Sequence, residues 1–305
     1  MLTRELGKAD APATRWRDYY TLTKPGVVQL LVFTAIVGMF LGTSPPGMVP
    51  WDVLIFGSLG IGLAAASGAV VNHILDQRFD AQMARTKDRP LPTGRVNERD
   101  ALAFALALGL LGIAVLALLV NPLTAGLTFV SLIGYAVIYT VFLKRATPQN
   151  IVIGGAAGAA PPMLGWAAVN GTVTGDALLL LLIIFTWTPP HFWALAIARK
   201  ADYERAGIPM LPVTHGEEVT KSFVIYYTIL LLVVTVLPYL TGMSGLLYLL
   251  GALLLGAGFL YYAIELKQRP GTERAMPTFG YSITYLIALF SFLLVDHYIP
   301  AFWPE

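Results

Sequence analysis

Seven stretches of the sequence contain no charged residue, and each is long enough to cross a membrane. One helical crossing needs roughly 20 residues, so the two longest stretches, 101–143 and 222–264, would each hold two spans joined by a turn. The chain is 56% apolar and 12% charged, whereas a soluble domain has about 25% charged residues. The sequence therefore predicts an all-α polytopic membrane protein with nine transmembrane helices. The uncharged stretches cover 27–51, 53–75, 101–143, 146–175, 177–198, 222–264 and 275–295.

The expected spans form one domain, 25–299, between a polar N-terminal arm, 1–24, and a short tail, 300–305. The arm is not followed by a short apolar region with a small-residue cleavage site, so we interpret it as a cytoplasmic arm and not as a signal peptide. Two long polar loops, 76–99 and 200–220, are expected to form a cap. The nine helices are expected near 25–43, 52–75, 100–120, 123–143, 149–169, 177–199, 221–240, 245–266 and 278–297.

The cations are distributed by membrane side. All 20 Lys and Arg fall in the N-terminal arm and in every second loop, and none falls in the other loops or the tail. Under the positive-inside rule this pattern predicts a cytoplasmic N-terminus and an outside C-terminus in the cell's inner (plasma) membrane. A nucleic-acid partner is not expected, because the cations do not gather on one soluble face. With no cysteine, disulfides and thiolate metal sites are excluded.

The second expected span ends in three oxygen-bearing side chains spaced by four residues: Asn72, Asp76 and Asp80. On a helix this spacing places all three on one face. Two carboxylates so placed repel each other unless a cation lies between them. Carboxylate and amide oxygens suit Mg²⁺, which usually also binds substrate phosphate. The motif therefore predicts a Mg²⁺–diphosphate site at the membrane surface, and the alternative is that the aspartates begin a solvated loop.

Further charged residues end three expected helices on the same side and could complete such a site. The acidic one is Asp202, a candidate metal ligand. The basic ones would bind diphosphate, although residues beside a span are also common topology anchors. They are Arg85, Lys87, Arg89, Lys144, Arg145 and Lys200.

Several motifs resemble a known family. The segment "NHILDQRFD" resembles the N-x-x-x-D-x-x-x-D motif of the UbiA superfamily of intramembrane prenyltransferases. Three more segments resemble the heme-directed branch of that superfamily, the protoheme IX farnesyltransferases or heme O synthases. They are "LKRATPQNIVIGGAAGAAPPMLGW", "WTPPHFWALAI" and "DYERAGIPMLPV". The resemblance runs from about Lys24 to Pro212 and weakens over the last three helices.

The resemblance implies nine transmembrane helices around a central cavity, with a cytoplasmic cap and an active site that opens toward the cytoplasm. It also implies transfer of a farnesyl group from farnesyl diphosphate to a vinyl group of heme b, with addition of water, giving heme O and diphosphate. Asn72, Asp76 and Asp80 would hold Mg²⁺ and diphosphate. Many members have a second D-x-x-x-D motif, but here Asp202 is followed at that spacing by Ala206. A second metal site would therefore be absent or built differently.

Farnesyl transfer requires a stabilised carbocation as well as a neutralised leaving group. Asp76, Asp80 and Lys144 are the candidates for promoting departure of the diphosphate. Tyr135 and Tyr139 lie one turn apart just before Lys144, and their ring faces could stabilise the cation. Tyr139 is the preferred catalytic candidate, and interfacial belt positions are the alternative for both tyrosines.

Two histidines and a tryptophan are candidates for binding heme. His191 follows Pro189 and Pro190, where we expect a broken helix and a cavity. His73 lies beside the Asn72 motif, and Trp187 lies one turn before His191. A buried histidine that is hydrogen-bonded to a neighbouring carbonyl is the commoner situation and remains the alternative.

Two other functions compete with heme farnesylation. A prenyltransferase with an aromatic acceptor, such as a quinone or chlorophyll precursor, would share the diphosphate site. A coupled transporter would place ionisable residues near the bilayer centre, yet the expected spans carry their charges only at their ends. As partners the resemblance implies farnesyl diphosphate, heme b and the lipid bilayer, and it suggests heme A synthase or a terminal-oxidase assembly.

Overall fold

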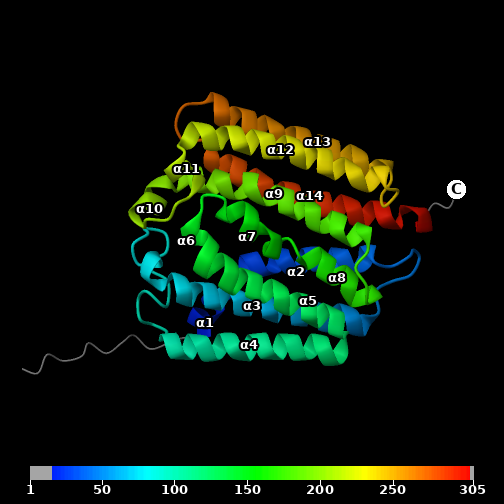
Figure 1. Cartoon of the computed structure of the whole chain (residues 1–305). Coiled ribbons are helices and arrows are strands. Elements are labelled where there is room, and N and C mark those ends of the chain that lie inside the picture. Colours follow the sequence, from blue (N-terminus) through cyan, green and yellow to red (C-terminus); the bar gives the residue numbers. More distant parts are fainter. Residues whose placement is uncertain (1–15, 303–305) are drawn as a thin grey trace, which may run out of the picture.

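The structure is a computed structural model that describes residues 16–302, and over this range it is a bundle of helices (Figure 1). One segment, η1, has the wider π-helical hydrogen-bonding pattern. The helices are α1 (Trp16–Leu22), α2 (Pro25–Leu41), α3 (Trp51–Asp80), α4 (Glu98–Leu119), α5 (Pro122–Ile133), η1 (Gly134–Leu143), α6 (Lys144–Ala146), α7 (Asn150–Gly158), α8 (Pro161–Asn170), α9 (Gly175–Ala198), α10 (Lys200–Arg205), α11 (Leu211–Thr214), α12 (Glu217–Leu240), α13 (Leu246–Gln268) and α14 (Ala275–Phe302).

The helices confirm the all-α polytopic class. Within residues 16–302, eight helical segments are long and apolar enough to cross a membrane, and the count is nine if the bent pair α1–α2 is one span. The axes of α1 and α2 differ by 54°. Two expected spans consist of joined segments, because α5 continues into η1 and α7 is followed by α8. Each of the nine expected helices has a counterpart in the bundle.

Local sequence explains where several helices begin. Asn97 and Asn121 precede α4 and α5, and each side-chain oxygen accepts a hydrogen bond of 2.8 Å from the amide three residues later. Such caps satisfy amides that have no partner within the helix. Pro122 then occupies the first helical position of α5, where its missing N–H costs nothing. The turn expected between the two spans of the stretch 101–143 is therefore confirmed, and it lies at Asn121.

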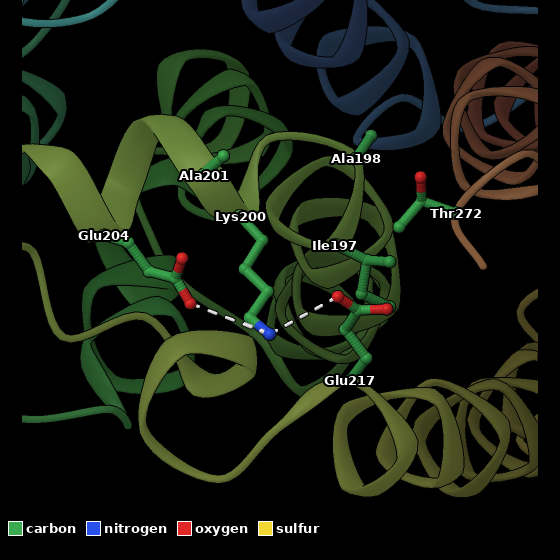
Figure 2. A pocket seen from close by; sticks show the side chains of 7 residues that line it. All are labelled: Ile197, Ala198, Lys200, Ala201, Glu204, Glu217 and Thr272. Carbon is green, nitrogen blue, oxygen red and sulfur yellow. Dashed lines mark ion pairs between the residues drawn. The ribbon is translucent and has the colours of Figure 1, made fainter.

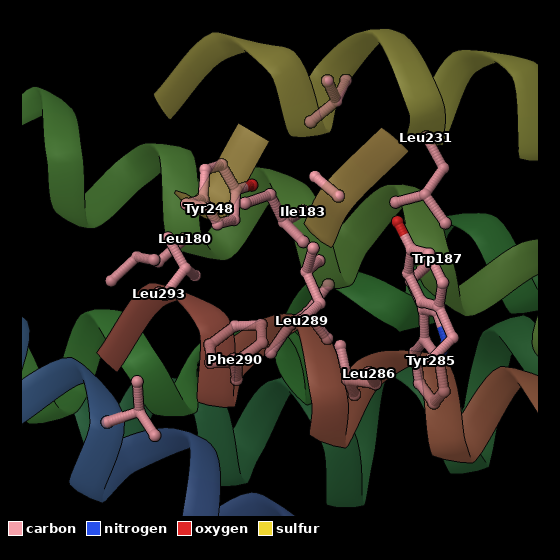
Figure 3. Packing of buried hydrophobic residues seen from close by; sticks show 14 of the residues in the cluster. Leu180, Ile183, Trp187, Leu231, Tyr248, Tyr285, Leu286, Leu289, Phe290 and Leu293 are labelled. Carbon is pink, nitrogen blue, oxygen red and sulfur yellow. The ribbon is translucent and has the colours of Figure 1, made fainter. Parts of the chain in front are cut away.

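Glycines allow close helix contacts. A Cβ added to Gly165 on α8 would lie 1.9 Å from the carbonyl oxygen of Ala35 on α2. Only glycine permits this approach, and small residues at helix crossings are typical of membrane bundles. A second kind of packing joins α9 to α12, α13 and α14 through large apolar side chains such as Leu180, Trp187 and Leu289 (Figure 3).

Two expectations about individual helices are wrong: where the second span ends, and whether the sixth span is broken. The second span does not stop near residue 75, because α3 stays helical to Asp80; the first cap loop is accordingly shorter than 76–99. The added turn carries Asp76 and Asp80, whose side chains are buried and paired with Lys144 and Arg89 within the protein. The helix α9 is also not broken at Pro189 and Pro190, but runs without interruption to Ala198.

The cap lies at one end of the bundle. The segment 81–97, coloured cyan in Figure 1, and the short helices α10 and α11 gather there, whereas the described end of α14 lies at the opposite end. An apolar cluster that includes Met83, Trp193, Ile208 and Met210 joins the cap to α9. The cap therefore covers the end of α3 that carries the aspartates.

Candidate active site

The three motif residues are buried on one face of α3. Asn72, Asp76 and Asp80 are 5%, 3% and 2% exposed, respectively. The amide nitrogen of Asn72 donates a hydrogen bond of 2.9 Å to Asp76 Oδ2. The alternative in which the aspartates begin a solvated loop is therefore excluded. Burying two carboxylates is costly unless cations and hydrogen bonds compensate them.

Three basic side chains from separate segments supply that compensation. Lys144 Nζ lies 2.5 Å from Asp76 Oδ2, and Arg89 lies 2.6 Å from Asp80 Oδ2. Lys24, between α1 and α2, donates a hydrogen bond to the side-chain oxygen of Asn72. Lys144 and Arg89 are paired with the two carboxylates, and Lys24 contacts a neutral amide oxygen, so the cluster has a surplus of one basic group over its acidic groups. A magnesium diphosphate, which is a net anion, matches this surplus.

Lys24 was not among the sequence-predicted site residues. The sequence shows it only as the last residue of the polar arm, directly before Pro25. Its backbone adopts the left-handed conformation, with φ of 51° and ψ of 61°, which is uncommon for residues other than glycine. The chain changes direction between α1 and α2 at Lys24, and the side chain of this residue contacts Asn72.

The donor set is compatible with Mg²⁺. Asp76 Oδ1 is buried and has no hydrogen-bond partner in the part of the chain that the structure describes, so it is available to a cation. No cluster of three or more His, Cys, Asp or Glu suited to a metal occurs within residues 16–302. The protein would therefore contribute few ligands, as is usual for Mg²⁺ that is bound together with water and substrate phosphate. Ligation by the Asn72 oxygen would require Lys24 to move.

The two candidate tyrosines lie in η1 beside this cluster. The rings of Tyr135 and Tyr139 are stacked with centroids 5.8 Å apart and planes 14° apart. The hydroxyl of Thr140 donates to the carbonyl of Tyr135 and lies 3.3 Å from the amide nitrogen of Asn72. Thr140 thus connects the π-helical segment η1 to α3, the helix that carries Asp76 and Asp80. Irregular helical turns of this kind are frequent at functional sites.

Tyr203 on α10 is a further residue near the cluster that the sequence did not single out. Burial raises the pKa of its phenol, and its charged neighbours include Asp76, Arg85 and Arg89. The phenol therefore stays protonated at neutral pH and can donate a hydrogen bond. Its position within "DYERAGIPMLPV" was the only available signal.

The remaining predicted polar residues are more dispersed. Arg85 and Lys87 are exposed in the cap segment, although the charge of Arg85 acts on Tyr203. Asp202 is partly buried, and its one ion pair in the described chain, 3.5 Å long, is with Arg205. The side chain of Arg145 lies outside the described residues.

Lys200 lies in a separate pocket of about 290 Å³ (Figure 2). Its ammonium group lies 3.4 Å from Glu217 and 3.6 Å from Glu204. Ion pairs link Lys200 to these two glutamates, and no described ion pair links it to Asp76 or Asp80. The structure therefore does not bring Lys200 together with the aspartate cluster.

The two candidate histidines have different surroundings. His73 on α3 is 2% exposed, neither of its ring nitrogens has a hydrogen-bond partner within residues 16–302, and Nδ1 lies 3.9 Å from Asp80 Oδ2. His191 on α9 is stacked on Trp187 with ring centroids 4.2 Å apart. Its Nδ1 lies 2.6 Å from the hydroxyl of Ser282 on α14. The alternative of a neighbouring carbonyl as partner therefore does not hold for either residue.

Comparison with known proteins places these features in a family. The family model for the UbiA prenyltransferase family matches residues 31–293. The chain is 60% identical to protoheme IX farnesyltransferase of Thioalkalivibrio sulfidiphilus, over 98% of each chain. It is 61% identical to that of Azotobacter vinelandii, over 93% of this chain and 95% of the relative.

Solved structures share the fold at low identity. A structure of digeranylgeranylglyceryl phosphate synthase has a TM-score of 0.75 at 18% identity and covers 92% of this chain and 98% of its own. A UbiA homolog from Archaeoglobus fulgidus, bound to DMAPP and Mg²⁺, has a TM-score of 0.67 at 17% identity and covers 90% and 99%. From the family model and the close relatives together, the chain belongs to the UbiA prenyltransferase family and, within it, to the protoheme IX farnesyltransferases.

Proposed function

We propose that this chain transfers the farnesyl group of farnesyl diphosphate to a vinyl group of heme b, with addition of water, and releases heme O and diphosphate. The observation that carries the proposal is 60% identity over 98% of the chain to a protoheme IX farnesyltransferase. The buried aspartates with their lysine and arginine partners support the same chemistry. An aromatic acceptor has no comparable support, because the solved structures at 16–20% identity bear on the fold alone.

The first chemical step breaks the bond between the farnesyl carbon and the diphosphate oxygen. Asp76 and Asp80 would hold Mg²⁺, which supplies Lewis-acid stabilisation of the negative charge on the leaving group. Lys144, Arg89 and Lys24 would bind the diphosphate oxygens by exchanging their present partners for the substrate. These basic groups are already in place, so little reorganisation is needed as charge develops.

The second step forms a carbon–carbon bond between the farnesyl cation and the heme vinyl group. The stacked faces of Tyr135 and Tyr139 would stabilise the cation before it is captured. Apolar walls would exclude water until the vinyl group has reacted. Water then adds to the cation formed beside the porphyrin and loses a proton, which gives the hydroxyl group of heme O.

The heme would lie near His191, with Trp187 and His73 as further candidates for contact. We place the cap and the diphosphate site on the cytoplasmic side of the inner (plasma) membrane, because the described segments with Lys and Arg meet at that end of the bundle. Heme A synthase or a terminal-oxidase assembly would be the receiving partner for heme O.

The decisive experiment compares two substitutions on the same helix. Purified Asp76→Asn protein should form heme O about 100-fold more slowly or worse, because it loses a buried charge on which the leaving-group site depends. Asp52→Asn serves as the control, since Asp52 is exposed in the first turn of α3, far from the site. The product is identified by the mass of the extracted heme after incubation with heme b, farnesyl diphosphate and Mg²⁺.

Two results would contradict the proposal. Wild-type protein that farnesylates an aromatic acid but not heme b would remove the heme assignment. Asp76→Asn protein with the wild-type rate at low substrate concentration would remove the aspartates from the site.

A further inference from the structure

His191 is held on three sides. Trp187, one turn earlier on α9, stacks on one ring face with centroids 4.2 Å apart, and Phe279 on α14 stacks with centroids 4.5 Å apart. One ring edge is occupied as well, because Nδ1 lies 2.6 Å from the hydroxyl oxygen of Ser282. The other ring nitrogen, Nε2, has no hydrogen-bond partner among residues 16–302.

The partners of Ser282 determine which nitrogen of His191 carries the proton. The Ser282 hydroxyl also lies 2.6 Å from the carbonyl oxygen of Phe279, which can only accept a hydrogen bond. A serine hydroxyl has one proton to donate, so that proton belongs to the bond with Phe279. The oxygen must then accept from His191, which requires Nδ1–H. Nε2 of the neutral ring is consequently left with a free lone pair.

Ser282 also holds the neighbouring tryptophan. Its backbone carbonyl accepts a hydrogen bond of 2.8 Å from Trp187 Nε1, and the residue is completely buried. One residue of α14 thus binds two side chains that are four residues apart on α9. This arrangement fixes both the tautomer of His191 and the orientation of its ring.

We propose that Ser282 is a positioning residue that presents the Nε2 lone pair of His191 as an axial ligand to the iron of the heme substrate. The inference rests on the proposed function, because it requires heme as the acceptor. A neutral imidazole with its other nitrogen donating a hydrogen bond is the usual state of a histidine that ligates iron. The stacked Trp187 and Phe279 would keep the ring from rotating away from the metal.

The test measures iron ligation separately from product formation. Heme b is titrated into purified wild-type, His191→Ala, Ser282→Ala and Ser291→Ala proteins without farnesyl diphosphate, and the Soret band is followed. Ser291 is a matched control, since it lies on the same helix and the one hydrogen bond of its hydroxyl within residues 16–302 is to the carbonyl of Ile287. Ser282→Ala should weaken heme binding about 10-fold or more, the usual cost of losing such a supporting hydrogen bond. Ser291→Ala should bind as the wild type does.

Resonance Raman spectroscopy of the ferrous complexes supplies a readout that a purely structural role would not change. The wild-type complex should show an iron–histidine stretching band that His191→Ala abolishes and Ser282→Ala shifts to lower frequency. Absence of this band from the wild-type complex would overturn the inference without any variant having to fold. Unchanged affinity and an unshifted band in Ser282→Ala would overturn it as well. Wild-type protein that makes heme O without the band contradicts only this inference, whereas failure to farnesylate heme b contradicts the proposed function.

Discussion

At the scale of single residues, Lys24 offers the clearest test of how the diphosphate is bound. Its ammonium group is held against Asn72, close to Lys144 and Arg89. A hydrogen bond to a charged group contributes about 1.5–3 kcal/mol, and 1.4 kcal/mol corresponds to about tenfold. Lys24→Met should therefore raise the KM for farnesyl diphosphate about 10-fold or more, as measured by steady-state kinetics at saturating heme b.

The control for Lys24 is a cation at the same end of the bundle that lacks contact with the site. Arg99 is exposed in the first turn of α4, so Arg99→Met should leave the KM unchanged. Lys24→Arg keeps the charge and should retain most of the affinity. An unaltered KM in Lys24→Met would show that the lysine serves only to neutralise the buried carboxylates.

The residues of the site differ in how well the sequence predicts them. Asn72, Asp76 and Asp80 were predictable because the helical repeat relates them within one segment. Lys24 and Tyr203 were not, because they reach the cluster only through the fold; Lys24 is 48 residues from its partner Asn72. Lys200 shows the opposite situation. Its charge and its expected membrane side made it a candidate for binding diphosphate, but its ion-pair partners in the structure are Glu204 and Glu217.

At the scale of helices, the position of the Tyr139 ring in the π-helical segment η1 depends on Gly154 of α7. A Cβ added to Gly154 would lie 2.1 Å from the ring of Tyr139. The ring would have to move, which would disturb its stacking on Tyr135. Because misplacement by about 1 Å can cost a factor of about 100 in rate, Gly154→Ala should lower kcat by about 10- to 100-fold in the heme O assay.

A second glycine on the same helix separates this effect from a general weakening of α7. A Cβ added to Gly158 would meet nothing within 4 Å in the described chain beyond its own neighbouring backbone, so Gly158→Ala should leave kcat near the wild-type value. The melting temperatures of both variants in detergent are to be compared. A wild-type kcat for Gly154→Ala would show that the position of Tyr139 does not matter for the reaction.

The helices themselves were predictable where length and charge decide them. Spans of about 20 uncharged residues are a local feature of the sequence, and the structure reproduces them. The π-helical turn was not predictable, because its hydrophobic pattern does not differ from that of an α-helix. The continuity of α9 through Pro189 and Pro190 was also missed, because a proline's effect on a buried helix depends on neighbouring elements that re-satisfy the freed carbonyls.

At the scale of the whole molecule, the distribution of charge determines how the chain would lie in the membrane. The cap segment 81–97 and the helix α10 gather at one end of the bundle, whereas loops such as 171–174 contain no charged residue. Because the positive-inside rule counts Lys and Arg near the ends of the spans, the cap should face the cytoplasm. The loop 171–174 should then face the outside.

The absence of cysteine from the sequence makes this orientation directly testable. Arg99→Cys and Thr172→Cys each introduce a single thiol at an exposed position, the first on the cap side and the second between α8 and α9. In intact cells, a membrane-impermeant maleimide should label Thr172→Cys, and it should label Arg99→Cys only after the membrane is permeabilised. The wild-type chain should remain unlabelled in both conditions. Labelling of Arg99→Cys but not Thr172→Cys in intact cells would reverse the orientation, and would place the diphosphate site on the outer side of the membrane.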